Sequence, residues 1–363
     1  MVLTRGDEYP IHQTPEPVAF AGTDRNFYDR YFFNGYAPDG SGFFAAALGI
    51  YPHLDVIDAH FSVVRGGVQH CIHASAPLRS ERMELRCGPI EVGIEEPLER
   101  LVVRLAPIEG LAAELRFAAR HFPIEEPRFT HRLGPRMFMD YTRMTQNGRW
   151  SGWIEVDGER RDLAQDTMGT RDRSWGIRPV GARDPQPVPG HELPGFFWQW
   201  TPVNFPGGSL FFHVNNDTQG RAWNTRAAWA GEGAMREDLA EGHGSMRTRL
   251  AAGTRWPSGG RLALAVPGAP EEVSFEPLGR FQMRGLGYTH PVWGHGIWHG
   301  GEKVEREDIP LDALDPLAAE NLHVQIPVRV ETSQGTGVGV FEQLIFGPFS
   351  PLGLNGYLSA SED

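Results

Sequence analysis

Lysine is almost absent from this chain of 363 residues: Lys303 is the only one, and the other basic residues are arginines. The phosphate-binding pattern G-x-x-x-x-G-K-[ST] is therefore missing, and Schiff-base chemistry would depend on Lys303 alone. Lys303 lies in the charged run 301–308, GEKVERED, which is typical of solvated surface. The sequence thus argues against nucleotide hydrolysis and pyridoxal chemistry.

Cysteine and long apolar runs are also scarce. Cys71 and Cys87 are the only cysteines, and their spacing fits neither C-x-x-C nor a zinc ribbon, so no disulfide framework or thiolate metal site is predicted. The first residues, MVLTRGDE, lack the apolar core of a signal peptide, and no run of about 18 apolar residues occurs. We expect a soluble cytoplasmic protein without membrane insertion.

Basic residues are fewer than acidic residues in this chain. Lys and Arg total 34 against 46 Asp and Glu, a formal net charge of −12, and no basic run stands out. Nucleic acids and anionic membranes are therefore not the expected partners. We expect a neutral, hydrophobic small molecule instead, and the oligomeric state stays open.

Turn-forming and aromatic residues are plentiful. The 44 glycines and 29 prolines separate short runs of β-branched and aromatic residues, while 40% hydrophobic residues suffice for a core. The sequence predicts an all-β protein of two antiparallel barrels or bent sheets in tandem. Its expected parts are an N-terminal arm (1–30), a first β domain (31–177), a Pro-rich joint (178–194) and a second β domain (195–363).

Several local predictions follow from the same patterns. Residues 111–121 fit a strand or a helix, and we favour the strand. Residues 136–146 and 150–156, closed by the Asp157-Gly158 turn, are expected to be paired strands. Residues 310–321 predict one helical piece, which Pro316 would break or start.

The familiar catalytic motifs are missing, including G-x-S-x-G, H-E-x-x-H and a strand-linked G-x-G-x-x-G. The densest histidine group is His290, His295 and His299 in YTHPVWGHGIWHGGE. On a strand, His295 and His299 would lie roughly 13 Å apart, too far for one ion. We therefore predict no metal and no cofactor, with a metal-dependent enzyme as the weakest alternative, and we expect His290 and Trp293 to line a ligand site.

The most distinctive segment is 169–176, GTRDRSWG. In one interpretation it is a structural clamp, in which Arg171 and Arg173 tie Asp172 and loop carbonyls together while Trp175 plugs a barrel end. In the other, Asp172 is a buried acid. Adjacent arginines would lower its pKa, which suits an anchor better than a proton donor.

The stretch GTRDRSWGIRP resembles the signature of the hydroxyneurosporene synthase (carotenoid 1,2-hydratase) and AttH-like superfamily, also met in kievitone-hydratase-like and some Diels–Alderase proteins. Residues 31–36 (YFFNGY) and 43–52 (FFAAALGIYP) look like an uncharacterised bacterial branch. The resemblance implies two lipocalin-like domains that hold a hydrophobic ligand in a barrel or at their interface. Some members add water to an alkene or guide a cyclisation.

Further candidates come from strand patterns. The resemblance places FFWQW, with Trp198 and Trp200 on one strand face, where hydratases line the reacting alkene. It expects an acidic residue in the next strand, where this chain instead has His213 and Asn215 on one face. Asp140 and Tyr141 adjoin in an apolar strand, so one of the two faces inward whichever register holds.

These features predict a cofactor-independent enzyme for a hydrophobic isoprenoid, steroid-like or polycyclic molecule, working by hydration, dehydration, isomerisation or cyclisation. Asp172 or Asp140 would be the acid. Tyr141 and His213 would orient or relay the proton, and the ligand would contact Trp175, Trp198, Trp200, Asn215, His290 and Trp293. The alternative is a non-catalytic carrier, which needs only apolar pocket walls.

Overall fold

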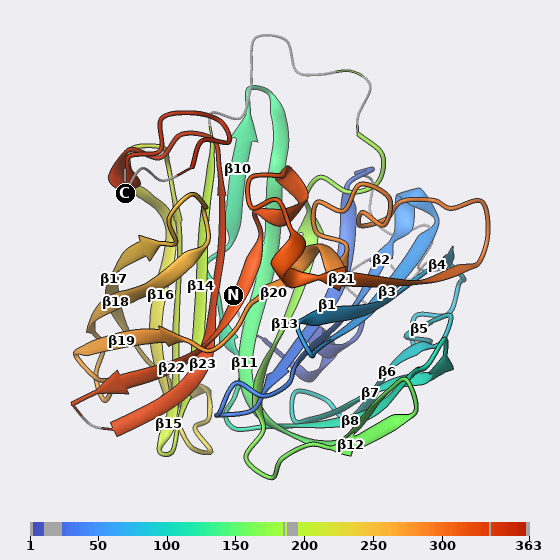
Figure 1. Ribbon diagram of the computed structural model, residues 1–363, viewed down its shortest axis with the longest axis horizontal. Helices are drawn as coiled ribbons and strands as arrows, with labels where there is room; N and C mark the ends of the chain where they lie inside the picture. The colour runs from blue at the N-terminus through green and yellow to red at the C-terminus, as the bar shows by residue number, and fades with distance from the viewer. Residues whose placement is uncertain (1–2, 11–23, 184–185, 187–194, 334, 361–363) are drawn as a thin grey trace.

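The computed structural model describes residues 3–10, 24–183, 186, 195–333 and 335–360. In Figure 1 the strands form two neighbouring sheets, one at each side of the view. The described residues contain strands and short 3-10 helices, and both sheets are antiparallel, which confirms the all-β class. Within this described part, no helix is long and apolar enough to span a membrane.

The first sheet is strongly curled and has 14 strands. They are β1 (Phe27–Tyr36), β2 (Phe43–Tyr51), β3 (Val56–Arg65), β4 (Val68–Pro77), β5 (Arg86–Cys87), β6 (Ile90–Glu96), β7 (Arg100–Ile108), β8 (Leu111–Ala119), β9 (Ile124–Glu125), β10 (Phe129–Leu133), β11 (Arg136–Val156), β12 (Glu159–Asp162), β13 (Met168–Ile177) and β21 (Lys303–Pro310). Their order is β21-β4-β3-β2-β1-β13-β11-β8-β7-β6-β5, with β9, β10 and β12 also paired to β11.

The second sheet closes into a barrel, because β19 pairs with β22. Its strands are β14 (Phe196–Phe205), β15 (Gly208–Asn216), β16 (Ala222–Gly231), β17 (Ala240–Leu250), β18 (Pro257–Ala265), β19 (Glu272–Pro277), β20 (Phe281–Gln282), β22 (Val324–Thr332) and β23 (Gly335–Phe346). The 3-10 helices are η1 (Arg5–Glu8), η3 (Pro52–Leu54), η4 (Arg236–Asp238), η5 (Met283–Leu286), η6 (Leu311–Ala313), η7 (Ala319–Asn321) and η8 (Ser350–Leu352).

Local predictions had mixed outcomes. The strand expected at 111–121 is confirmed as β8, and the turn at Asp157 (φ 51°) and Gly158 (φ 83°) has the positive angles expected of it. The expected pairing of 136–146 with 150–156 is wrong, because β11 runs through both segments and the turn leads to β12 instead. The helical piece at 310–321 consists of η6 and η7, which lie on either side of Pro316.

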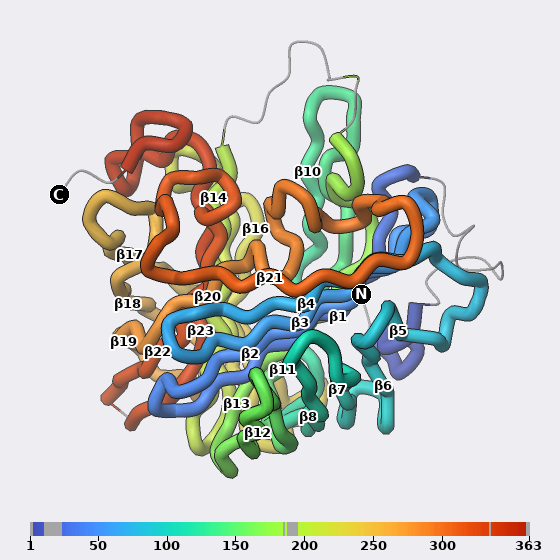
Figure 2. The backbone as a smooth tube through the Cα atoms, turned by 45° about the vertical axis from the view of Figure 1, so that its right-hand side comes forward, coloured from blue at the N-terminus to red at the C-terminus, as the bar shows by residue number. Residues whose placement is uncertain are grey.

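The charged run 301–308 is not simply solvated surface. Most of it forms β21, which pairs antiparallel with β4 at the edge of the first sheet (Figure 2). An edge strand leaves one side free, so charged residues are tolerated there and also discourage further pairing. A segment from the second half of the chain thereby extends the sheet of the first half.

The chain passes from one sheet to the other between β13 and β14. Most of the expected joint at 178–194, and residues 11–23 of the expected arm, lie outside the described residues. The first strand begins at Phe27, four residues before the expected start of the first domain.

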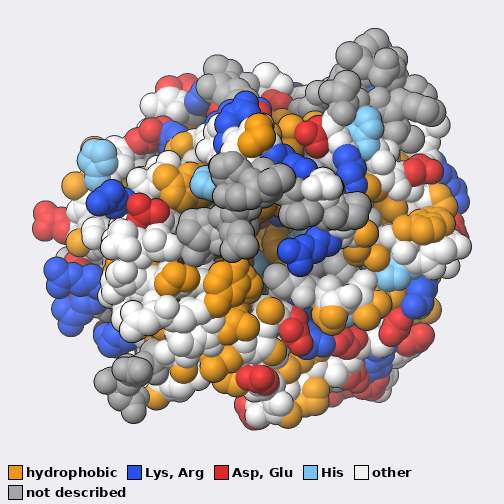
Figure 3. All heavy atoms as spheres, turned by 90° about the horizontal axis from the view of Figure 1, so that it is seen from above, with side chains coloured by type: hydrophobic (Ala, Val, Ile, Leu, Met, Phe, Trp, Pro, Cys, Tyr) orange, Lys and Arg blue, Asp and Glu red, His pale blue; other side chains and the backbone are white. Residues whose placement is uncertain are grey.

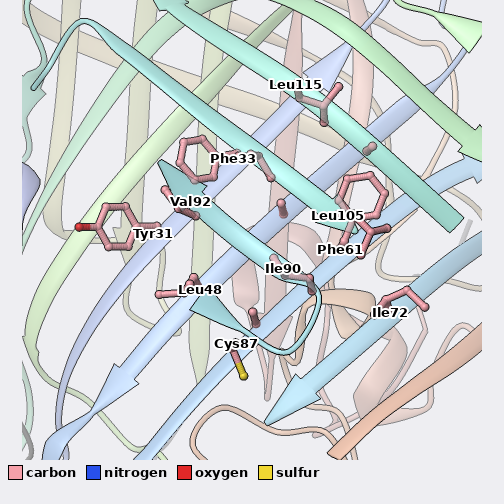
Figure 4. Packing of buried hydrophobic residues seen from close by; sticks show 14 of the residues in the cluster. Tyr31, Phe33, Leu48, Phe61, Ile72, Cys87, Ile90, Val92, Leu105 and Leu115 are labelled. Carbon is pink, nitrogen blue, oxygen red and sulfur yellow. The ribbon is translucent and has the colours of Figure 1, made fainter. Parts of the chain in front are cut away.

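Three hydrophobic clusters form the core. One fills the curl of the first sheet and includes Tyr31, Phe33, Phe61 and Leu115 (Figure 4). A second lies inside the closed barrel, and a third lies between the two sheets. Strand alternation produces this division, because successive side chains of β1 and β14 face opposite sides.

Candidate active site

We call the layer between the two sheets the seam. It lies between β1, β11 and β13 of the first sheet and β14 and β23 of the barrel (Figure 1). The Phe32 and Trp200 rings meet edge to face across it, with centroids 6.0 Å apart. The Trp200 indole also donates a hydrogen bond to Thr145 on β11, at 3.1 Å. Side chains of both sheets therefore contribute to one buried site.

The distinctive 169–176 segment belongs to β13, a central strand, and not to a loop. Asp172 pairs in register with Phe32 and Thr145 and faces the seam. Arg171 and Arg173 face the opposite side because neighbouring residues of a strand alternate. The clamp interpretation, in which these two arginines tie Asp172, is therefore wrong in its geometry.

Both arginines instead hold the N-terminal part of the chain. The Arg171 guanidinium donates two hydrogen bonds to the Glu8 carboxylate, at 2.7 and 2.8 Å, and both side chains are fully buried. Arg173 pairs with Asp29. Trp175 lies on this same side, against the cluster of Leu3, Leu98 and Met144, and is not brought together with Trp198 or Trp200.

Two glycines of the segment allow close approach of neighbouring strands. A Cβ at Gly176, whose φ is +136°, would lie 2.3 Å from the carbonyl oxygen of Asp140. A Cβ at Gly169 would lie 2.1 Å from the carbonyl oxygen of Asn34. Only glycine fits these positions without a shift of backbone.

Arg143 lies at the centre of the site. Its Nη2 donates a hydrogen bond to Asp172 at 3.0 Å, and its Nε lies 3.4 Å from Glu126. The guanidinium carbon is 4.9 Å from the Trp198 ring centroid and 5.1 Å from that of Trp200, within cation–π range. One cation thus joins two buried carboxyl groups and two indole rings.

Burial controls the protonation of these carboxyl groups. Burial raises the pKa of Asp172 to about 6, against the opposing effect of Arg143 and with help from Glu126 and Glu342. Burial likewise raises the pKa of Glu126, although Arg143 and Thr145 favour its ionised form. Asp172 is thereby tuned near the range in which an acid can donate and recover a proton.

Two polar residues of β15, His213 and Asn215, face the same site. His213 is fully buried, its Nε2 is 2.6 Å from the Asn224 side-chain oxygen, and burial lowers its pKa to about 3. Its Nδ1 lies 3.6 Å from Oε2 of Glu126, and neither atom has a hydrogen-bond partner among the described residues. The Asn215 amide is also buried and without a partner. Buried polar atoms of this kind need a water or a ligand to satisfy them.

Glu342 on β23 completes the barrel side of the site. It accepts hydrogen bonds from the Trp198 indole at 2.8 Å and from Gln325 at 2.6 Å, and it lies 2.8 Å from His323. Burial disfavours its ionised form, but His323 and Arg143 outweigh burial and lower its pKa. Glu342 is therefore an ionised anchor that holds Trp198.

Asp140 and Tyr141, which are adjacent on β11, face opposite sides of the sheet. Tyr141 is buried in the seam and stacks on Phe129, with ring centroids 4.5 Å apart. Asp140 faces the other side, where it pairs with Arg128 at 2.6 Å and is one-quarter exposed. Asp140 is thus not brought together with Asp172.

The predicted ligand residues near 290 lie in another part of the molecule. His290 and Trp293 contact His73 on β4, and the Nε2 atom of His290 lies 3.1 Å from Glu307 on β21. His295 contacts the Leu286 carbonyl instead. The three histidines of this loop therefore do not converge on one point.

A metal site is poorly supported in this region. Cys71, His73 and Glu307 offer ligand atoms within 4.8 Å of one another. Burial raises the pKa of the Cys71 thiol to about 12, so the thiol stays protonated at neutral pH. His290 Nδ1 accepts two backbone N–H groups, so its Nε2 carries the proton toward Glu307.

A surface cleft of about 390 Å³ leads toward the candidate site. Glu126 is among its lining residues, with Phe122, Pro123 and Leu239 on its apolar part. On the face of the molecule shown in Figure 3, acidic, basic and hydrophobic side chains are interspersed.

Three central residues were missed from the sequence. Arg143 and Glu342 are charged residues inside apolar strand patterns, RMFMDYTRM and VGVFEQLIF, and the pattern alone could have identified them. Glu126 lies between Pro123 and Pro127 and offers no such pattern. Only the three-dimensional contacts with Arg143 reveal it.

A family model of unknown function, DUF8625, matches residues 3–355. The chain belongs to this family. Among curated proteins, none matches it.

Solved structures with the same fold share little sequence with this DUF8625 member. An AttH-like protein from Nitrosomonas europaea has 16% identity and a TM-score of 0.54, with 92% of this chain and 98% of that chain covered. Kievitone hydratase from Nectria haematococca has 10% identity and a TM-score of 0.53, with 88% and 89% covered. These similarities confirm the fold, two antiparallel β domains in tandem, that the resemblance to AttH-like proteins implied.

Proposed function

We propose that this protein is an enzyme that performs acid–base chemistry on a hydrophobic small molecule bound in the seam. The observation that carries the proposal is the Arg143 group, in which one guanidinium joins Asp172 and Glu126 beside two indole rings. Burying titratable groups costs free energy. Proteins commonly bury them in this way at functional sites, where the protonation of the groups takes part in the chemistry. The fold shared with kievitone hydratase is consistent with a hydratase but supports only the architecture.

The groups divide into an acid and a base. Asp172, with its raised pKa, donates a proton to a substrate carbon. Glu126 Oε2 and His213 Nδ1, 3.6 Å apart and unpartnered, hold and deprotonate a water molecule. In the hydration direction the hydroxyl forms a bond to one alkene carbon, the Asp172 proton to the other, and the water proton passes to Glu126. Dehydration is the reverse, and isomerisation needs only the carbon protonation and deprotonation.

The position of Arg143 selects among these reactions. Its positive charge already lies on the faces of Trp198 and Trp200, so a free carbocation beside these rings would be repelled. A guanidinium stabilises negative charge that develops on an oxygen. The site therefore favours a substrate whose alkene is conjugated to a carbonyl, so that an enol or enolate forms during proton transfer.

A carrier would need only apolar walls, whereas the seam contains several titratable groups.

A deuterium-labelling experiment distinguishes an enzyme from a carrier. The protein is purified from its own cells, native mass spectrometry detects a bound molecule, and the complex is incubated in deuterated water. An enzyme releases a ligand with deuterium bound to carbon. A carrier releases it unlabelled, and protein without any bound hydrophobic molecule would contradict both functions.

A further inference from the structure

A second group of buried polar residues lies along the same side of β1 and β13 as Asp172. Tyr28 and Arg30 alternate on β1 toward the seam, and Arg178 follows β13. The Arg178 guanidinium carbon lies 4.3 Å from the Tyr28 ring centroid and 5.7 Å from that of Tyr288. Arg30 approaches the Tyr288 ring as well, at 5.1 Å. Two guanidinium groups thus flank one tyrosine ring.

These two cations have few counter-charges. Among the described residues Arg178 forms no ion pair, and the one hydrogen-bond partner of its guanidinium is the Nδ1 atom of His295, at 3.1 Å. Arg30 donates to the Tyr51 hydroxyl and the Leu286 carbonyl, and its closest carboxylate, Asp58, is 3.9 Å away. Two guanidinium groups with one carboxylate between them, 3.9 Å from Arg30, leave positive charge uncompensated.

Donor atoms of the group also lack acceptors. The Nε atoms of Arg30 and Arg178 and the hydroxyl of Tyr28 are buried and make no hydrogen bond within the described part of the chain, although the Tyr28 hydroxyl lies near that of Ser174. Tyr28 is fully buried and Arg30 is 1% exposed. Unpaired buried donors next to uncompensated positive charge are the chemistry that recognises an oxyanion.

We propose that Arg30, Arg178 and Tyr28 bind an acidic group, a carboxylate or an ionised enol or phenol, at one end of the hydrophobic substrate. The proposal rests on the function assigned above to the seam and names the class of substrate, a hydrophobic organic acid. Arg30 is paired with Ser174, two residues from Asp172 on the same face. Such neighbours lie about 7 Å apart, so the acidic group is held a few bonds from the reacting carbon.

The experiment compares two small probes that differ only in charge, 2-naphthoate and 2-naphthylmethanol. Both are titrated calorimetrically at pH 8 into the full-length protein and into Arg178→Gln, Arg178→Lys and Arg329→Gln. The last variant makes the same substitution at an exposed arginine of β22 that pairs with Glu276. We expect the parent protein and Arg329→Gln to bind the acid at least tenfold more tightly than the alcohol. Arg178→Gln should reduce this preference to less than threefold, with unchanged affinity for the alcohol, and Arg178→Lys should retain part of it.

Each result bears on a different claim. Equal affinity of the parent protein for both probes, or an unchanged preference in Arg178→Gln, would overturn the anion site and leave the proposed enzyme intact. Binding of neither probe would contradict the anion site and also the hydrophobic seam. Thermal unfolding of each variant guards against misfolding, and the retained alcohol affinity of Arg178→Gln provides a second check.

Discussion

The Arg143 guanidinium donates a hydrogen bond to the Asp172 carboxyl group at 3.0 Å, from β11 to β13 of the same sheet. The same guanidinium reaches Glu126, which follows β9, and lies against two indole rings of the barrel. The contact therefore joins parts of the chain that are far apart in sequence. It also couples the protonation of Asp172 to that of Glu126, because both share one counter-charge.

Replacing the acid should abolish the chemistry and preserve the fold. We expect Asp172→Asn to lower the rate of deuterium incorporation by about 10²-fold or more, since an amide cannot supply the proton. Mass spectrometry of the released ligand measures this rate. Asp140→Asn makes the same substitution on the opposite face of β11 and should leave the rate within about twofold of the parent protein. Equal loss in both variants would contradict the role of Asp172.

The rate should also depend on pH. Burial raises the pKa of Asp172 to about 6, and only its protonated form donates a proton. The rate of labelling should therefore fall as pH rises above about 6, approaching tenfold per pH unit. A rate that stays constant from pH 5 to pH 8 would show that another group is the donor.

The free energy of unfolding should also fall as pH rises, mainly between about pH 4 and pH 6. The folded protein binds the Asp172 proton more tightly than the unfolded chain, whose Asp pKa is about 3.9. The stabilisation from this group is complete below about pH 4 and is lost as pH rises through about 6. Urea unfolding should show the parent protein losing stability relative to Asp172→Asn across this interval. A constant difference between the two would refute the raised pKa.

The buried pair on the other side of β13 should matter for stability. Glu8→Gln leaves the Arg171 guanidinium buried without its carboxylate, and we expect a loss of about 3–5 kcal/mol in the free energy of unfolding. Glu91→Gln is the matched control, because Glu91 pairs with Arg104 at a site where both are about 40% exposed. Denaturant titration should find the control within about 1 kcal/mol of the parent protein. A similarly small effect of Glu8→Gln would mean that residues 3–10 contribute little to the fold.

The glycine at the end of the distinctive segment should not tolerate a side chain. Gly176→Ala introduces a Cβ 2.3 Å from a carbonyl oxygen at a positive φ, so we expect a loss of more than about 1 kcal/mol. Gly207→Ala adds a Cβ with no atom within 4 Å and should be nearly neutral. The two unfolding midpoints give the comparison, and equal midpoints would contradict the close packing of β13 on β11.

Local pattern was enough to predict the strand class of most of the chain, because apolar alternation and Gly or Pro turns recur throughout. It failed for β13, since three charged residues in succession do not look like a central strand. Their partners explain the exception: Glu8 and Asp29 neutralise Arg171 and Arg173 on one side, and Arg143 meets Asp172 on the other. Such pairs are distant in sequence, so no local pattern reveals them.

Prediction of the candidate active site from the sequence is limited in the same way, because its residues are distant in sequence. Asp172 was predicted from its distinctive segment, and His213, Trp198 and Trp200 from single strands; the four lie together in the seam, around Arg143 and Glu126. Their common centre, Arg143, was not predicted, because its role depends on which strands are neighbours. Likewise, β21 crosses to the first sheet from the second half of the chain, and edge pairing of that kind depends on backbone hydrogen bonds rather than on side-chain pattern.

The most direct test of the account is a crystal structure of the protein with the molecule that co-purifies with it. We predict that the ligand lies in the seam beside Trp198 and Trp200, with a carbon atom within about 3.5 Å of an Asp172 carboxyl oxygen. A ligand inside the closed barrel or within the curl of the first sheet, with no carboxyl group at its reactive carbons, would contradict the account.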